Sequence, residues 1–516
     1  MNVRAQIAEP VAPHGDDEAA LDRELCYRAL RTRDARFDGR FYTGVTSTGI
    51  YCRPICPART PKLENCMFLP SAAAAQRLGF RPCLRCRPEA APGHAVARGT
   101  LNTVSRALQL IADGQLASGE LEAFSGRLGI GTRQLRRLFD RHVGASPVQV
   151  AQTQRMLLAK QLLSETELPI SQVALAAGFG SVRRFNAAFR RTYERAPSDV
   201  RTSTARRRTG RESDPVVEIR LSYAPPYDFQ AMLDFLGARA IPGVERVHDG
   251  EYQRAFRLGD AYGSFSVRDC PEQSQLLARI RCTEIEPLGQ VVARLRRVFD
   301  LDADSRTIDA QLSQDPLMAA RVRERPGVRV PGAWDHFELA VRAVLGQQVS
   351  VSAATTFAAR IVAQYGTPLP ESARMPHSAR KPQAPEAPAT DQLFPSPKTL
   401  AGADFVAIGL TGARIASLQS LARAVCTDDQ CLQPAASLDD SVAKLCALPG
   451  IGPWTAQYIA MRALREPDAL PVGDLGLIRA LFGSSARVPP RQMALRTQLF
   501  RPFRAYACLR LWLQPA

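Results

Sequence analysis

Four of the twelve cysteines stand in two close pairs, a spacing that could bind a metal ion. Cys52 and Cys56 lie in "GIYCRPICPAR", and Cys83 and Cys86 follow in "FRPCLRC", with 26 residues between the pairs. Four thiolates suit tetrahedral zinc, because soft sulfur ligands close its coordination shell. Spacing alone favours a structural zinc centre. Coordination also keeps sulfur deprotonated, however, so a ligand cysteine can act as a nucleophile.

The composition indicates the partner of such a centre. The chain has 516 residues and a formal net charge of +17. Strongly basic proteins typically bind polyanions, and nucleic acid is favoured here over a merely solvated basic surface. The first residues lack the apolar core of a signal peptide, and no window approaches the length of a membrane span. We expect a cytoplasmic, nucleoid-associated protein, in which paired cysteines are metal ligands or reactive thiols rather than disulfides.

Changes in composition divide the chain into several parts. The arginine-rich segment "RTSTARRRTGRES" is typical of a linker, and a proline-rich run interrupts the last helical region. The expected parts are a disordered tail at 1–20, a compact cysteine-bearing domain at 21–92, a helical block at 97–203, a basic linker at 204–213, an α+β domain at 214–322, and a helical domain at 323–516 with a flexible insertion near 367–397.

The cysteine-bearing segment, from "RFYTGVTSTGIYCRP" to "FRPCLRCRP", resembles the amino-terminal zinc domain of the Ada family. In that family the first cysteine accepts a methyl group from a DNA methylphosphotriester, which implies Cys52 as the acceptor. Methylation turns an anionic thiolate into a neutral thioether and so weakens the repulsion of DNA phosphate. The resemblance implies Cys56, Cys83 and Cys86 as the other zinc ligands. Phosphate binding is favoured by the surrounding arginines Arg53, Arg59, Arg81, Arg85 and Arg87, of which Arg59 and Arg81 occupy motif positions. The alternative is a zinc ion with a purely structural role.

Two helix-turn-helix signals occupy the next block. In "LEAFSGRLGIGTRQLRRLFDRHVGASP" an apolar helix leads through a glycine-containing turn to a second helix. The stretch "PISQVALAAGFGSVRRFNAAFRRTYERAP" resembles the second motif of AraC-type regulators. The candidate DNA contacts are Arg133, Gln134, Arg136 and Arg137 in the first motif and Ser181, Arg183, Arg184 and Asn186 in the second. The alternative for each of them is a residue that only solvates its helix or touches phosphate.

The remaining region resembles AlkA-type 3-methyladenine DNA glycosylases. The motifs "FELAVRAVLGQQVSV", "LCALPGIGPWTAQYIAMRAL", "LPVGDLGLIRALF" and "YACLRLWL" occur in the family's order. "LPGIGPWTA" predicts a helix-hairpin-helix, in which Gly450 and Gly452 let the backbone approach a DNA phosphate. In related glycosylases, hairpin carbonyls can also hold a monovalent cation that bridges to DNA.

The resemblance implies Asp474, in "VGDLGL", as the catalytic carboxylate. A carboxylate there would stabilise the positive charge that builds on the sugar when an N-glycosidic bond breaks. The alternative for Asp474 is a helix N-cap or a surface carboxylate. Relatives that also cut the strand place a Schiff-base lysine two residues after the second hairpin glycine, where this chain has Trp454. We therefore predict a monofunctional glycosylase that leaves an abasic site.

An everted alkylated base would stack on aromatic walls. By family position the candidates are Phe235, Trp454, Tyr458 and Trp512, with core packing as the alternative. Gln347 and Gln348 are candidates for entering the gap in the DNA. Two departures bear on this site: Gln348 replaces the leucine that fills the gap in the best-known relative, and Leu475 replaces a tyrosine.

The predicted fold class is multidomain and predominantly α. It combines a small α/β zinc domain with four cysteine ligands, an AraC-type double helix-turn-helix, an α+β AlkA-type amino-terminal domain and an all-α helix-hairpin-helix domain. The predicted function is repair of alkylated DNA and the transcriptional response to it. The expected partners are double-stranded DNA, both alkylated and promoter, and RNA polymerase, and we expect a monomer. The alternative is a methylation-sensing transcription factor whose carboxy-terminal half only binds DNA.

Overall fold

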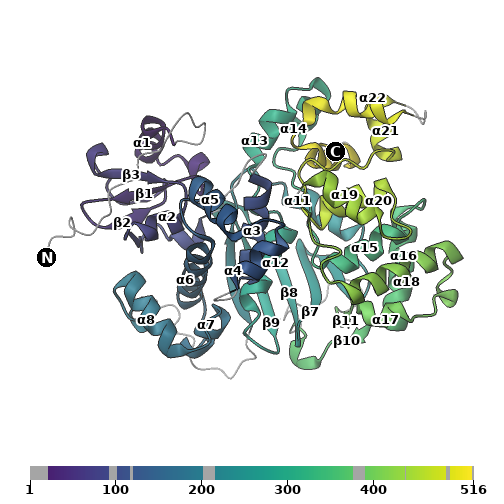
Figure 1. The fold of residues 1–516 in the computed structure, drawn as a ribbon, viewed down its shortest axis with the longest axis horizontal. Coiled ribbons are helices and arrows are strands. Elements are labelled where there is room, and N and C mark those ends of the chain that lie inside the picture. The colour runs from purple at the N-terminus through teal and green to yellow at the C-terminus, as the bar shows by residue number, and fades with distance from the viewer. Residues whose placement is uncertain are drawn as a thin grey trace. The chain divides into compact units, whose positions relative to one another are not determined.

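The structure is a computed structural model that describes residues 21–91, 101–116, 120–201, 216–375, 390–435, 437–483 and 488–513 (Figure 1). The expected tail at 1–20 and linker at 204–213 lie outside these ranges. The chain forms two compact units, one comprising residues up to 224 with 285–293, and the other comprising 225–284 with 294–516. Among the described residues, no helix has the length and apolar character needed to cross a membrane.

A four-stranded sheet of order β3-β1-β2-β4 forms the centre of the cysteine-bearing domain (Figure 1). Its elements are α1 (Arg23–Thr32), β1 (Tyr42–Val45), β2 (Ile50–Cys52), β3 (Cys66–Leu69), α2 (Ala72–Arg77) and β4 (Arg81–Pro82), with 3-10 turns at Ala35–Phe37, Leu63–Asn65 and Pro88–Ala90. β1 pairs antiparallel with β2 and β3, whereas β4 runs parallel to β2. Gly44 is required in β1, because a Cβ there would lie 2.7 Å from the ring of Phe80.

Helices make up the block that follows. They are α3 (Leu101–Ala112), α4 (Leu121–Arg127), α5 (Thr132–His142), α6 (Pro147–Glu165), α7 (Ile170–Ala176), α8 (Val182–Tyr193) and α9 (Pro197–Val200), and the strand β5 (Val217–Ser222) comes after them in the chain. The long helix α6 begins with a capping box of Ser146 and Gln149 and packs against α2, α3 and α7. The pairs α4–α5 and α7–α8 are the two predicted helix-turn-helix motifs.

Polar contacts join the zinc domain to this helical block within the first unit. The hydroxyl of Ser71, which caps α2, also donates to the backbone oxygen of Val143 at 2.6 Å. Lys160 of α6 forms an ion pair with Glu89 in which both side chains are buried. A buried ion pair fixes geometry closely, because losing either partner leaves an uncompensated charge.

An antiparallel sheet lies at the start of the second unit. Its strands β6 (Glu245–His248), β7 (Glu251–Leu258), β8 (Ala261–Cys270) and β9 (Gln275–Cys282) are neighbours in that order. Helix α11 (Phe229–Gly237) precedes the sheet, and α12 (Leu288–Val298) follows it and crosses the boundary between the units. The ring of Trp334 packs on Phe256 and Phe265, with both centroid distances 5.0 Å.

The rest of the second unit is helical and surrounds one large apolar core. Its helices are α13 (Ser305–Leu312), α14 (Pro316–Glu324), α15 (His336–Leu345), α16 (Val351–Tyr365), α17 (Pro397–Ala401), α18 (Gly412–Thr427), α19 (Leu438–Cys446), α20 (Pro453–Arg462), α21 (Leu475–Phe482), α22 (Pro490–Arg496) and α23 (Arg504–Trp512). Together with the zinc domain and the helix-turn-helix block, this architecture confirms the predicted fold class.

The region expected to be a flexible insertion, 367–397, has regular structure at both ends. β10 (Thr367–Pro368) pairs antiparallel with β11 (Gln392–Leu393). Leu369 and Leu393 are buried in a small cluster that also contains Ala255 of β7. Burial of these leucines anchors the two ends to the sheet, whereas 376–389 lie outside the described residues.

Candidate metal centre and active site

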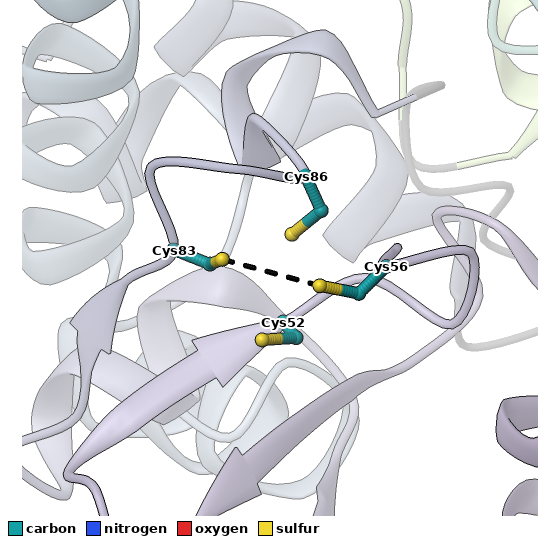
Figure 2. Close-up of side chains that lie close together, drawn as sticks. All are labelled: Cys52, Cys56, Cys83 and Cys86. Atoms are coloured by element: carbon teal, nitrogen blue, oxygen red, sulfur yellow. Dashed lines mark hydrogen bonds between the residues drawn. The ribbon is translucent and has the colours of Figure 1, made fainter. Parts of the chain in front are cut away.

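The four predicted zinc ligands converge although they come from different segments (Figure 2). Cys52 ends β2 and Cys56 lies in the loop after it, whereas Cys83 and Cys86 follow β4. The four sulfur atoms all lie within 4.8 Å of one another, and those of Cys56 and Cys83 are 4.0 Å apart. A tetrahedral zinc ion with bonds of about 2.3 Å needs S–S edges of roughly 3.8 Å. The chemistry and spacing of the donor set therefore fit zinc.

Exposure distinguishes Cys52 from the other three ligands. Cys56, Cys83 and Cys86 are buried, whereas Cys52 is only partly buried. This difference concerns the whole residue, and the acceptor role of Cys52 stays a prediction.

Arg53 is buried beside the four-cysteine centre and hydrogen-bonds to it. Its backbone N–H donates to Sγ of Cys86 at 3.3 Å, and its side chain donates to the Cys86 carbonyl at 3.0 Å. Its guanidinium also forms an ion pair with Asp38, in which both side chains are buried. The expectation that Arg53 binds phosphate is therefore wrong, because these buried partners occupy it.

The other arginines near the centre differ in their availability. Arg87 pairs with Glu89 at 3.2 Å and with Glu165 of α6 at 2.5 Å, so it belongs to the contact between the domains. Arg81 pairs with Glu194, at the end of α8, at 2.8 Å, and both side chains are substantially exposed. Exposed pairs are weak and can be exchanged for a phosphate. Arg59 and Arg85 are exposed.

The candidate DNA contacts lie on the outer faces of α5 and α8. In α5, Leu135 and Phe139 point into the core. The exposed candidates are Arg133, Gln134, Arg136, Arg137, Arg183 and Arg184. Ser181 is the N-cap of α8, where its hydroxyl accepts from the backbone N–H of Arg184 at 3.3 Å, and Asn186 is partly buried.

Asp474 sits between two tryptophans. Its Oδ2 accepts from Nε1 of Trp454 at 3.1 Å, and its Oδ1 accepts from Nε1 of Trp512 at 2.9 Å. Oδ1 also accepts the backbone N–H of Leu477 at 3.0 Å, which makes Asp474 the N-cap of α21. Asp474 is therefore a helix N-cap, as the alternative interpretation had it. The two indoles also orient the plane of its carboxylate, which a cap does not require.

The aromatic candidates other than Phe235 gather around this carboxylate. The rings of Trp454 and Tyr458 are parallel, with centroids 5.5 Å apart and planes 6° from each other. The ring of Trp512 lies 6.2 Å from that of Tyr458. Together with Asp474 these side chains line a cavity of about 380 Å³. The cavity is large enough to receive a purine.

Phe235 is not a wall of this cavity. It is 4% exposed, and the guanidinium groups of Arg239 and Arg462 lie 3.7 and 4.7 Å from the centroid of its ring. The two arginines line the cavity in its place. Phe235 is thus buried and absent from the lining of the cavity, so the structure offers no support for its predicted contact with a base.

Several cavity residues were missed by reasoning from the sequence. Arg462 donates to the Tyr458 hydroxyl at 2.9 Å. Burial raises the pKa of Tyr458, but the positive charges of Arg462 and Arg239 outweigh it and lower that pKa below 10. The spacing of Trp454, Tyr458 and Arg462 at every fourth residue of α20 was a usable signal, since such residues share a helix face.

A buried ionic network forms another part of the lining. Arg254 pairs with Glu245 at 2.8 Å and also with Glu338, and Arg342 pairs with both glutamates. Burial alone would raise the pKa of Glu245, but the charges of Arg342 and Arg254 lower it to about 2. No local sequence pattern predicts this network, because its members come from β6, β7 and α15.

The hairpin before α20 has the predicted glycine geometry. Gly450 has φ +83°, and a Cβ there would lie 1.9 Å from Oγ of Ser417. Gly452 is the N-cap of α20. Nε2 of Gln347 donates to the Gly450 carbonyl at 2.9 Å, whereas Gln348 is exposed.

Comparisons with known families match successive parts of the chain. The model "Metal binding domain of Ada" matches residues 25–89, and "Helix-turn-helix domain" matches 124–203. "AlkA N-terminal domain" matches 218–335, and "HhH-GPD superfamily base excision DNA repair protein" matches 341–497.

Three curated proteins are similar to all or part of the chain. A Mycobacterium tuberculosis protein, "Probable bifunctional transcriptional activator/DNA repair enzyme AlkA", is 40% identical over 95% of this chain and 96% of its own length. The Escherichia coli "DNA-3-methyladenine glycosylase 2" is 33% identical over 57% of this chain and 95% of its own. The E. coli "Bifunctional transcriptional activator/DNA repair enzyme Ada" is 33% identical over 30% of this chain and 42% of its own.

Proposed function

Because the chain belongs to the family of bifunctional transcriptional activators and DNA repair enzymes of the AlkA type, we propose that it excises alkylated bases such as 3-methyladenine from double-stranded DNA. The observation that carries this proposal is the carboxylate of Asp474, which two indoles hold at the cavity that Trp454 and Tyr458 line. Few structural roles require a carboxylate with both oxygens oriented beside an aromatic pocket.

In the proposed reaction the damaged nucleotide leaves the helix and its base enters the cavity. The bond between C1′ and the base nitrogen breaks, and its electron pair stays with the base. An alkylated purine already carries positive charge, so it leaves readily. Asp474 stabilises the cationic sugar and orients a water whose oxygen adds to C1′, while the water's proton passes to solvent. Trp454 stands where a lyase would have its lysine, so the product is an uncut abasic strand.

The zinc domain would carry out a separate, single-use methyl transfer. Bound zinc keeps the thiol of Cys52 deprotonated at neutral pH. The sulfur of Cys52 attacks the methyl carbon of a phosphotriester, the carbon–oxygen bond breaks, and the phosphate oxygen keeps the electron pair. The protein loses one negative charge at this surface, which favours its approach to DNA phosphate. The convergence of the four cysteine sulfurs and the match of residues 25–89 to the metal-binding domain of Ada support this assignment.

Recognition of promoter DNA would fall to α5 and α8. Their exposed arginines can reach bases and phosphates, with Arg59 and Arg81 holding the backbone near the zinc domain. We propose that the protein activates transcription through contact with RNA polymerase. We also propose that it acts as a monomer and is located in the cytoplasm, associated with the nucleoid. The proposed domain limits are 21–92, 97–203, 214–322 and 323–516.

The hairpin would anchor the glycosylase on the strand. The N–H groups at the start of α20 can face a phosphate, and the glycines leave room for its approach. Hairpin carbonyls could also hold a monovalent cation between protein and phosphate.

A base-release assay tests the glycosylase. Asp474→Asn removes the charge but keeps a good N-cap, so α21 should remain folded. We expect the wild type to release alkylated bases and the variant to lose at least about 100-fold in single-turnover rate. Asp304→Asn, at the N-cap of α13, is the matched control and should stay active. An inactive wild type would instead favour a methylation-sensing transcription factor.

Mass spectrometry tests the methyl transfer. After incubation with methylphosphotriester DNA, one added methyl is expected on Cys52 and none after Cys52→Ser. An unmodified wild-type Cys52 would mean that zinc is purely structural.

A further inference from the structure

The side chain of Gln347 connects the turn between α15 and α16 to the glycine hairpin before α20 by hydrogen bonds. Gln347 lies between α15 and α16, and its Nε2 donates to the Gly450 carbonyl at 2.9 Å and to Oγ1 of Thr455 at 3.0 Å. Its own backbone carbonyl accepts from Nη2 of Arg414 at 2.6 Å. Thr455 is 2% exposed and follows Trp454, so the contact reaches the helix that carries the pocket wall.

The side chain of the next residue, Gln348, is exposed instead of being held by the protein. Gln348 is exposed and has φ +57°, a left-handed conformation that disfavours residues with a side chain. Such a conformation persists only when the surroundings hold it. Gln347 supplies that support through its side chain and its carbonyl. Of the two candidates for entering the DNA gap, Gln348 is therefore exposed and available to DNA, whereas the side chain of Gln347 is held by hydrogen bonds within the protein.

We propose that Gln347 is a positioning residue for base extrusion. It sets the separation between Gln348, which enters the gap, and the hairpin and Trp454, which receive the phosphate and the base. This role rests on the proposed glycosylase function. It assigns Gln347 no contact with the base and no part in bond breaking.

The physical reason lies in how the cost of extrusion is offset. Unpairing and unstacking a base costs a few kcal/mol. The gap residue, the hairpin and the pocket offset this cost only if all three engage the same duplex together. If the turn is released, Gln348 loses its fixed position and the gap is filled less often. The loss should be largest when the damaged base is well paired, and small when the base is unpaired from the start.

Gln347→Met tests the proposal, because methionine has similar length and no amide donor. Single-turnover base release is measured on one lesion in two duplexes, one with its normal partner and one with an abasic analogue opposite. We expect about a tenfold loss with the paired lesion and at most about a twofold loss with the unpaired one. Gln364→Met is the control, since the Gln364 amide donates to Oη of Tyr365 in the last turn of α16.

An equal loss on both duplexes, or no loss on either, overturns the proposal. Thr455→Val removes one acceptor of the Gln347 amide. We expect it to lower base release from the paired lesion more than from the unpaired one, by a smaller factor than Gln347→Met does. This second variant keeps the test available if Gln347→Met fails to fold. Fluorescence of 2-aminopurine beside the lesion reports extrusion without chemistry. An inactive wild type would therefore refute the glycosylase alone, whereas an unchanged fluorescence signal in Gln347→Met would refute the positioning role.

Discussion

The indole of Trp512 donates a hydrogen bond from Nε1 to Oδ1 of Asp474 at 2.9 Å, across 38 residues of chain. The last described helix of the protein thereby helps to orient the carboxylate assigned to catalysis. Trp454 does the same for the other oxygen, so the plane of the carboxylate is set from two helices.

Trp512→Phe should separate orientation from stacking. Phenylalanine keeps an aromatic ring but donates no hydrogen bond. We expect single-turnover base release to fall about tenfold, because one orienting bond to the carboxylate is lost. Thermal unfolding should show whether the fold is kept. Release at the wild-type rate would mean that the indole N–H does not position Asp474.

Arg239→Gln should raise the pKa of Tyr458. The positive charges of Arg462 and Arg239 stabilise the phenolate and lower this pKa despite burial, so removing one charge must shift it upward. Titration of a ¹³C-labelled tyrosine ring by NMR measures the change. Arg257→Gln, on β7 beside Tyr262 rather than Tyr458, is the control and should leave the pKa of Tyr458 in place.

Glu245→Gln should destabilise the second unit most at neutral pH. The folded pKa of Glu245 is about 2, below its ordinary value of 4.5, so its stabilising effect is present above about pH 4.5 and is lost as pH falls toward 2. We expect the free energy of unfolding to drop by about 3 kcal/mol at pH 7.

At pH 3 the difference between variant and wild type should be smaller. All three tryptophans, Trp334, Trp454 and Trp512, belong to the second unit, so their fluorescence in urea follows that unit. A difference that grows on acidification would contradict the assigned direction of the pKa shift.

Glu89→Gln should loosen the contact between the zinc domain and α6. The change leaves the buried ammonium of Lys160 without its carboxylate, which typically costs about 3 kcal/mol or more. Limited proteolysis of the first unit should become faster, while base release stays at the wild-type rate. Replacing both partners by Glu89→Gln with Lys160→Met should restore part of the protection.

Removal of zinc should abolish one activity and spare the other. Without the ion the four sulfur atoms take up protons and no bond joins them, so chelation should disorder the loops that carry Cys56 and Cys86. Methyl transfer to Cys52 is then expected to stop, with base release unchanged. A parallel loss of base release on chelation would show that the glycosylase depends on the metal.

Features that depend on near neighbours in the chain could be recognised from the sequence alone. The spacing of the four cysteines, the two helix-turn-helix motifs and the glycine hairpin are all patterns within short stretches, whereas the position of Asp474 was implied by the resemblance to the glycosylases. Each of these patterns follows from ligand chemistry, helix periodicity or turn geometry, which act between near neighbours in the chain. The fold class was implied by the resemblance of successive segments to known families.

Contacts between groups far apart in the chain became visible only in the folded structure. Arg53 turns inward to Asp38, two arginine side chains pack on the ring of Phe235, and Gln347 reaches the Gly450 carbonyl across 103 residues of chain. Buried donors and charges must find partners, and packing, not sequence spacing, determines which partners are within reach. The division of labour between Gln347 and Gln348 was therefore not predictable from two adjacent residues of one type.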